Sequence, residues 1–136
     1  MSKPRILKYE LPGEWILLVG ATDSDNEYLS TTLAKPEDWW FHADGVPGSH
    51  VILRAKRQDE PSRETLRQAA AVAAYHSKAR GAVAANVRCT RARHVTKPRG
   101  SKTGTVRVSA GAVWKVQPRI DFATRITGEK VDRDEG

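Results

Sequence analysis

Two apolar runs open the chain, at residues 6–11 and 14–19, and a Pro-Gly dipeptide separates them. Successive side chains of an extended strand point to opposite faces of a sheet. Every residue from 15 to 19 is apolar, so both faces of the second strand are suited to burial. The pattern predicts a β-hairpin within a sheet that is covered on both sides.

A second pair of strand-like runs, at residues 39–43 and 49–54, lies on either side of another Pro-Gly turn. The first run contains His42 and the second contains His50. If the two strands pair, both imidazoles lie near one end of the hairpin, and Gly48 lets another backbone approach closely. The residues alone leave two interpretations open, a buried hydrogen-bonded corner and a surface contact site.

One long helix is predicted over residues 63–80, with Ser62 as its N-cap and Gly81 as its stop. Small side chains, mostly alanine, recur on one face, so we expect the helix to lie close to the sheet. Another stripe carries Arg67 and Lys78 with only alanines between them. That stripe is either a surface that a phosphate backbone can approach or an ordinary solvated helix face.

Four further strands are predicted in the second half of the chain, at residues 82–90, 95–97, 105–108 and 113–116. In the first of these, Val83 and Cys89 belong to the inward-facing set. Cys89 is the single cysteine, so no internal disulfide forms, and we expect it to be a small buried apolar group. A short helix is also predicted, capped by Asp25 or Asn26 and ending before Pro36.

Together these elements predict an α+β fold, in which a mixed, largely antiparallel sheet is packed by one long Ala-rich helix over residues 63–80 and by a short helix. The 136-residue chain suits a single domain over residues 1–120. Residues 121–136 interleave acidic and basic side chains and contain few apolar positions. They are predicted to form a charged, flexible C-terminal tail.

The charge of the chain is distributed very unevenly. Its formal net charge is +7, but residues 65–120 contain 12 lysines and arginines and no aspartate or glutamate. Residues 1–64 hold 8 basic against 11 acidic side chains. Unless this acidic first half folds over the basic segment, those cations face solvent or an anion. The pattern favours a polyanion-binding surface, and the alternative is a solvated basic surface without a function.

Residues 98–104 form the most basic loop, with two glycines, Arg99 and Lys102. Glycines allow backbone N–H groups to turn toward an anion while the two cations supply charge, so the loop is a candidate phosphate cradle. It is not a P-loop, because the required motif and the following helix are both missing. The alternative interpretation is a plain flexible hairpin tip.

We do not expect the chain to be an enzyme. His42 and His50 are the candidates for acid-base chemistry, with Asp38 or Asp44 to orient one of them, but no nucleophile motif accompanies them. No spacing typical of a metal site supports a metal ligated by these residues, and no cofactor is expected. A small His-dependent hydrolase or nuclease remains an alternative. The N-terminus leads into no apolar run that suits a signal peptide or a membrane span, so we expect a cytoplasmic location and no membrane partner.

Two blocks of the sequence stand out, WFHA at residues 40–43 and PGSHVIL at residues 47–53. Further blocks lie at residues 26–30, 61–70, 73–80 and 95–106. Together these blocks resemble the NFACT RNA-binding domain, a module of large ribosome-associated quality-control proteins of bacteria, archaea and eukaryotes. The resemblance covers roughly residues 14–117. In those long proteins an N-terminal domain and a helical arm precede the module, whereas this chain is expected to be the module alone.

The resemblance implies a stand-alone protein that binds structured RNA, either tRNA or rRNA, through a basic surface. It also implies a link to translation and ribosome quality control, with the ribosome as a candidate partner. The alternative from another class is a protein–protein adaptor with incidental affinity for polyanions. The candidate RNA contacts are His42, Gly48, Ser49, His50, Arg54, Arg67, Lys78, Arg80, Arg88, Arg91, Arg93, Lys97, Arg99 and Lys102.

Overall fold

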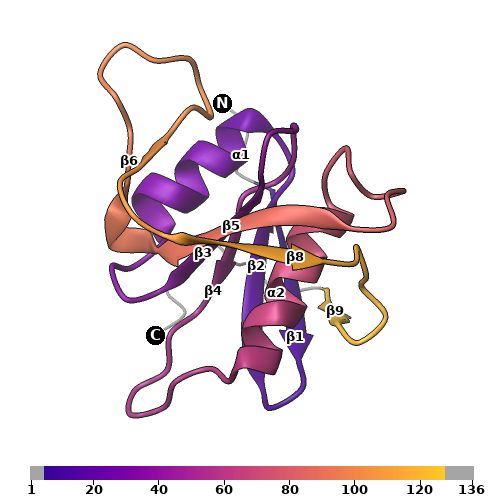
Figure 1. The fold of residues 1–136 in the computed structure, drawn as a ribbon. Coiled ribbons are helices and arrows are strands. Elements are labelled where there is room, and N and C mark those ends of the chain that lie inside the picture. The colour runs from indigo at the N-terminus through magenta and orange to yellow at the C-terminus, as the bar shows by residue number, and fades with distance from the viewer. Residues whose placement is uncertain (1–4, 128–136) are drawn as a thin grey trace.

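The computed structural model describes residues 5–127 as a twisted antiparallel sheet with helices on both of its faces (Figure 1). Seven strands follow the order β8-β5-β3-β4-β2-β1-β9, and all of their pairings are antiparallel. The α+β class and the largely antiparallel sheet are therefore confirmed. The strands are β1 Ile6–Leu11, β2 Trp15–Gly20, β3 Trp39–Ala43, β4 Val51–Leu53, β5 Ala85–Arg91, β8 Ala112–Val116 and β9 Thr124–Ile126, and a separate ribbon pairs β6 Val95–Thr96 with β7 Arg107–Val108.

The first hairpin forms as predicted, with Leu11 opposite Trp15 across the turn. Strand β2 contributes apolar side chains to both faces of the sheet. Leu17 belongs to the core cluster beneath the helix at residues 63–75, whereas Leu18 belongs to a second cluster on the opposite face. This two-sided burial explains why the strand is apolar at consecutive positions.

Helix α2, Arg63–Tyr75, is shorter than the predicted 63–80 helix, so the prediction of one long helix is wrong. Its start is as expected, because the Ser62 hydroxyl accepts a hydrogen bond from the Thr65 backbone N–H at 3.1 Å. The early end has a tertiary cause. Ser77 leaves the helix to form an isolated antiparallel bridge with Gly48, and the Lys78 N–H donates to the Pro47 carbonyl at 2.9 Å.

The short helix begins earlier than predicted. Helix α1, Asp23–Tyr28, continues as a π-helical segment, Leu29–Leu33, that ends where the sequence indicated. Its cap is Thr22 rather than Asp25 or Asn26. Thr22 and Asp25 form a reciprocal capping box, in which each side chain accepts from the backbone N–H of the other residue.

Strand β5 begins at Ala85, three residues later than predicted. Val83 is 91% exposed, so the prediction that it faces inward is wrong. Residues 76–84 instead form an irregular corner that carries the chain from α2 to β5, and Figure 1 shows this loop projecting from the sheet. The prediction for Cys89 is confirmed, because it is buried in the core and this burial raises the pKa of its thiol to about 12.

The described domain extends past residue 120, where the sequence predicted a tail to begin. Strand β9 pairs with β1, placing Arg125 opposite Tyr9, and Phe122 packs against the core cluster beneath α2. Only two apolar residues in this stretch, Phe122 and Ala123, pack against the core cluster, and this signal is too short to be recognised by periodicity. The rest of the predicted tail, residues 128–136, lies outside the described residues.

Candidate nucleic-acid interface

The two histidines of the central hairpin converge as predicted. His42 lies in β3 and His50 directly precedes β4, and their ring centroids are 5.2 Å apart with perpendicular planes. Trp40 stacks on His42 with centroids 5.9 Å apart and meets the edge of His50 at 5.3 Å. The three rings form one contiguous cluster between the sheet and the segment that follows α1.

A hydrogen-bond network holds His50 inside this cluster. The Ser30 hydroxyl lies 2.7 Å from Nδ1 of His50 and accepts a bond from Nε1 of Trp40 at 2.9 Å. The His50 backbone N–H donates to the side-chain oxygen of Asn26 at 3.0 Å. Because Ser30 has one proton and accepts from the indole, the network is satisfied when it donates to a neutral His50. Ser30 and Asn26 were not singled out in the sequence, since neither stands in a chemical motif.

The electrostatics of this corner favour neutral imidazoles. Burial, together with repulsion from His42, lowers the pKa of His50 to about 3. Burial also lowers the pKa of His42, although hydrogen bonds with the backbone at Gly48 and Ala43 oppose this effect. The His50 residue is 5% exposed, so it supports the shape of the corner from within. The sequence left open whether the histidines form a buried hydrogen-bonded corner or a surface contact site, and His50 belongs to a buried corner.

A surface groove lies beside the histidine cluster, between the turn of the central hairpin and the end of α2. The Ser49 N–H donates to the His76 carbonyl at 3.0 Å, and this bond together with the Gly48–Ser77 bridge joins the central hairpin to the end of α2. The groove has a volume of about 440 Å³. It is lined by Ala21, Thr22, Asp23, Asn26, Pro47, Gly48, Ser49, His76, Ser77, Lys78 and Arg80. Four predicted contact residues, Gly48, Ser49, Lys78 and Arg80, are therefore brought together.

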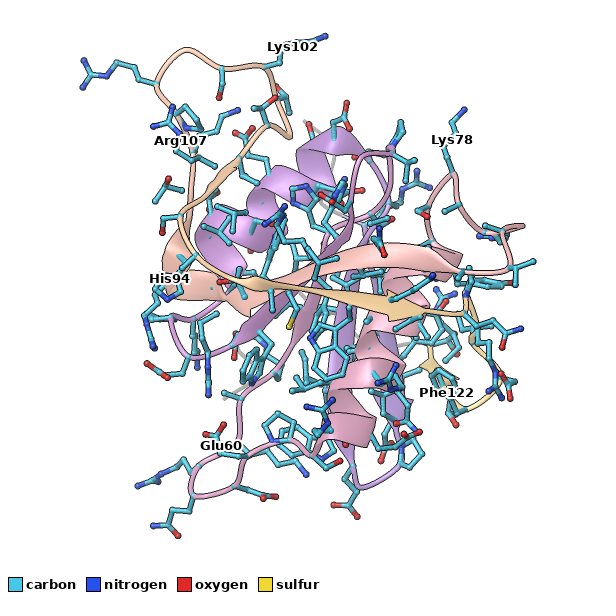
Figure 2. The ribbon with its side chains drawn as sticks, in the orientation of Figure 1. Glu60, Lys78, His94, Lys102, Arg107 and Phe122 are labelled. Carbon is cyan, nitrogen blue, oxygen red and sulfur yellow. The ribbon has the colours of Figure 1, made fainter. Side chains whose placement is uncertain are left out.

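Two cations line this groove. Lys78 is exposed, and Figure 2 shows it pointing away from the body of the protein. Arg80 lies over the ring of Tyr75 at 4.1 Å and donates to the Tyr75 carbonyl at 2.6 Å. Among the residues that the structure describes, no carboxylate forms an ion pair with either cation. Both charges are available to an external anion.

The loop between β6 and β7, residues 97–106, is called the basic loop below. Glu27 of α1 anchors it by accepting from the Gly104 N–H at 2.9 Å and pairing with Lys97 at 3.0 Å. These two hydrogen bonds, with Gly104 the larger influence, lower the pKa of Glu27. Lys97 also donates to the carbonyls of Ser101 and Lys102, so this lysine stabilises the conformation of the loop from within.

The tip of the basic loop carries the unpaired charge. Arg99 and Lys102 are exposed, and Arg107, just beyond the loop in β7, is exposed as well. Within residues 5–127, none of the three pairs with a carboxylate. Figure 2 places Lys102 and Lys78 on the same side of the protein, on separate loops. Arg107 was missed as a candidate, although the same composition argument applies to it.

Asp23 of α1 connects the two cationic loops. It lines the groove with Lys78 and Arg80, and a Cβ atom built on Gly104 would lie 3.2 Å from the Asp23 Cβ. The groove and the basic loop are thus neighbouring parts of one surface.

Four of the other predicted contacts form ion pairs within the protein. Arg54 pairs with the buried carboxylate of Asp38 at 2.8 Å. Three more pair with acids from the first sixty-four residues: Arg88 with Asp44 at 3.4 Å, Arg91 with Glu37 at 3.5 Å and with Glu60 at 2.8 Å, and Arg93 with Glu37 at 2.8 Å. The acidic half does fold over part of the basic segment. Arg67 lies elsewhere, beside β8, where it donates to the Lys115 carbonyl at 3.3 Å.

Comparison with known proteins decides the family. The model of the NFACT protein RNA binding domain matches residues 7–110. The chain belongs to this family. The Rqc2 homolog RqcH of Bacillus subtilis (strain 168) is 37% identical over 123 residues, which make up 90% of this chain and 21% of that protein. The Rqc2 homolog RqcH of Streptococcus suis (strain 05ZYH33) is 38% identical over 109 residues, or 80% of this chain and 19% of that protein.

A solved structure has the same fold. It is the C-terminal part of the fibronectin/fibrinogen-binding protein from Streptococcus suis, with a TM-score of 0.83 and 33% identity over 93% of this chain and 51% of that chain. The NFACT RNA-binding domain described here spans about a fifth of the length of its curated relatives. The predicted resemblance is confirmed, and the family match covers the elements from β1 to β7.

One further contact in this NFACT domain escaped sequence reasoning. His76, which lines the groove, accepts or donates a hydrogen bond with the Tyr9 hydroxyl at 3.0 Å. Burial, with added repulsion from Arg80 and Arg125, lowers the pKa of His76 to about 4. The partners lie 67 residues apart, so no local pattern predicts the pair.

Proposed function

We propose that this NFACT domain binds structured RNA, tRNA or rRNA, through a surface that we call the cationic rim: Lys78, Arg80, Arg99, Lys102 and Arg107. The supporting observation is that these five exposed cations lack carboxylate partners in the described part of the chain. Four lie on two loops that meet at Asp23, and Arg107 lies in β7, directly after one of these loops. The choice of RNA over other polyanions rests on the family. A role in ribosome quality control in the cytoplasm is proposed from the identity of the RqcH relatives.

The rim supplies binding energy mainly by releasing counterions from the phosphate backbone. If about five phosphates are neutralised, the logarithm of the affinity falls against the logarithm of the salt concentration with a slope of roughly −3.5 to −4.5. Arg80 also presents its guanidinium stacked on Tyr75, an arrangement that can continue onto an unpaired base. The groove beside the rim offers room for part of a nucleotide, with Gly48 and Ser49 in its wall.

We propose binding without catalysis. His50 is shielded and neutral, and His42 is held against Trp40 and the backbone, so the pair lacks an accessible acid-base partner for a substrate. Within the described residues, no three His, Cys, Asp or Glu side chains are grouped so that they could hold a metal ion. No helix in that part of the chain has the length and apolar character needed to cross a membrane.

The decisive experiment compares two double variants that change the net charge equally. Arg99→Glu with Lys102→Glu should lower the affinity for a bulk tRNA preparation by more than about tenfold and reduce the salt slope by about 2. The matched control, Arg57→Glu with Lys115→Glu, alters exposed cations outside the rim and should leave the affinity within about twofold. Fluorescence anisotropy between 50 and 200 mM KCl measures both quantities. Equal losses in the two double variants would show that net charge, not the rim, governs binding.

A third double variant, Arg91→Glu with Arg93→Glu, tests whether cations that already form ion pairs contribute less to RNA affinity than unpaired ones. Both arginines are engaged by Glu37, and Arg91 also by Glu60, so we expect a smaller loss of affinity than for the basic loop. Turnover of the tRNA by the wild-type protein, abolished by His42→Ala, would support a nuclease instead. Stoichiometric binding without cleavage supports the proposal.

A further inference from the structure

A second groove lies beside the edge strand β8, away from the cationic rim. Its volume is about 540 Å³, larger than that of the groove at the rim. Apolar side chains form part of its lining, namely Ala71, Val83, Val116 and Phe122. Three cations also line it, namely Arg67 of α2, Lys115 of β8 and Arg119 of the segment that follows β8. The groove combines an apolar floor with a basic border.

The most exposed large hydrophobic side chain of the described residues lies in this groove. Val83 is 91% exposed and Val113 is 47% exposed, and they are the large hydrophobic side chains that residues 5–127 leave in solvent. Val83 lines the groove, whereas Val113 alternates with Trp114 and Val116 of the core and therefore lies on the opposite face of β8. An exposed apolar side chain in a groove is typical of an interaction surface.

Strand β8 also presents an open sheet edge. It pairs with β5 on one side, and no other strand within residues 5–127 pairs with its outer side. Figure 1 shows β8 at the front of the sheet, with no other strand in front of it. Arg67 bonds one of its carbonyls, that of Lys115. Unpaired backbone groups along a strand edge are a template for an added strand.

The basic side chains around this groove favour the binding of carboxylates. Arg67 and Lys115 have no carboxylate partner among the described residues, whereas Arg119 is held by Asp121 at 2.9 and 2.7 Å. Glu64 is the one acidic side chain in the lining. The groove therefore keeps an excess of positive charge around its apolar floor.

The aromatic rings of this region are covered by cations. The guanidinium groups of Arg63 and Arg67 each lie over the ring of Trp114 at 5.2 Å, and that of Arg119 lies over Phe122 at 5.6 Å. A phosphodiester chain makes no use of the exposed Val83. A peptide with alternating apolar and acidic side chains can cover Val83, pair with the cations and bond the strand edge together.

We infer that the β8 groove docks an acidic, apolar segment of a partner protein, which adds to the sheet as an extended strand. Main-chain hydrogen bonds to β8 supply affinity, and side chains on alternate positions enter the groove or meet its cations. This site is separate from the cationic rim, so the domain can hold RNA and a protein partner at once.

The test uses a fluorescein-labelled octapeptide that alternates valine and glutamate, with a valine–lysine octapeptide as its matched control. We expect the full chain to bind the acidic peptide and not the basic one. Val83→Asp combined with Lys115→Glu should weaken acidic-peptide binding at least tenfold, and since both residues are exposed these substitutions should preserve the fold. Arg99→Glu with Lys102→Glu should leave peptide binding unchanged. Slowed hydrogen exchange at β8 amides in the presence of the peptide would identify strand addition.

Three results would overturn the inference: no binding of the acidic peptide to the wild-type chain, equal binding by the Val83→Asp, Lys115→Glu variant, or displacement of the peptide by tRNA. The last result would assign the groove to nucleic acid. Circular dichroism of each variant separates loss of the site from loss of the fold. If the rim variant loses tRNA but still binds peptide, the two surfaces act independently.

Discussion

Gly48 and Ser77 face each other in an isolated antiparallel bridge, and a Cβ atom at position 48 would lie 2.7 Å from the Cβ of Ser77. The bridge joins the turn of the central hairpin to the segment that directly follows α2. It therefore determines where Lys78, the next residue, projects. A glycine is required here by close approach of two backbones rather than by an unusual backbone conformation.

Gly48→Ala should therefore lower both stability and RNA affinity. The added methyl group forces Ser77 and the corner apart, which corresponds to an overpacking penalty of about 1–3 kcal/mol in the free energy of unfolding. Urea unfolding measures the first effect and tRNA anisotropy the second. Gly81→Ala is the matched control, because a Cβ there meets nothing within 4 Å, and it should leave both quantities nearly unchanged. Equal stability of the two variants would show that the contact is not tight.

The same bridge shows what the sequence could not predict. Helical periodicity runs through residue 80, and nothing local indicates that Ser77 prefers a partner 29 positions away to another turn of helix. Val83 was predicted to face inward because it keeps the alternation of the following strand. Both errors arise where a tertiary contact or an irregular corner overrides a local pattern.

The hairpins and the histidine corner were predictable for the opposite reason. Strands β1 to β4 carry strong apolar runs separated by turn residues, and the facing of His42 and His50 follows from strand alternation once the hairpin pairs. The sequence predicted how many basic side chains the second half of the chain contains, but not which of them form ion pairs. The ion pairs of Arg91 and Arg93 with Glu37 join residues more than fifty positions apart, so the sequence could count these cations but not identify which remain free.

Stability should fall as the pH is lowered from about 6.5 toward 3, because His50 titrates differently in the two states. Its pKa is lowered to about 3 in the folded protein, whereas the unfolded chain takes up the proton near the ordinary value of 6.5. Between these values the unfolded state binds more protons, so protonation favours unfolding. One such group changes the free energy of unfolding by about 1.4 kcal/mol per pH unit in this range. His76, with a pKa of about 4, adds to the effect.

His50→Leu should flatten this dependence by about 1.4 kcal/mol per pH unit between pH 4 and 6. It should also lower stability at pH 7, because Ser30 loses its partner at Nδ1. Urea unfolding at several pH values measures both changes. An unaltered slope would mean that His50 is not the titrating group.

Asp38→Asn should destabilise the fold without changing the cationic rim. The Asp38 carboxylate is buried, pairs with Arg54, and accepts from the Ala55 and Lys35 N–H groups at 2.8 and 2.9 Å. Removing one partner of a buried pair leaves an uncompensated charge, for which a loss of about 3 kcal/mol is typical. The control Glu37→Gln alters an adjacent exposed carboxylate, and we expect a change within about 0.5 kcal/mol. Thermal unfolding compares the two, and equal effects would contradict a special role for Asp38.

Asp23→Asn should strengthen RNA binding. Asp23 lies between the groove and the basic loop, and no ion pair within residues 5–127 neutralises it, so it repels a phosphate chain that spans the rim. Removing one exposed charge at this position should raise tRNA affinity about threefold at low salt, and the gain should shrink as salt screens the repulsion. The helix loses a favourable charge in its first turn, which lowers stability by about 0.5 kcal/mol.

Asp121→Asn serves as the control for this gain, because Asp121 lies beside the β8 groove, where it binds Arg119. It changes the net charge by the same amount and should alter tRNA affinity far less than Asp23→Asn does. Anisotropy titrations at 50 and 200 mM KCl distinguish the two. If both substitutions raise affinity equally, the overall charge of the chain attracts the RNA. A gain confined to Asp23→Asn places the phosphate backbone across the junction of the two loops.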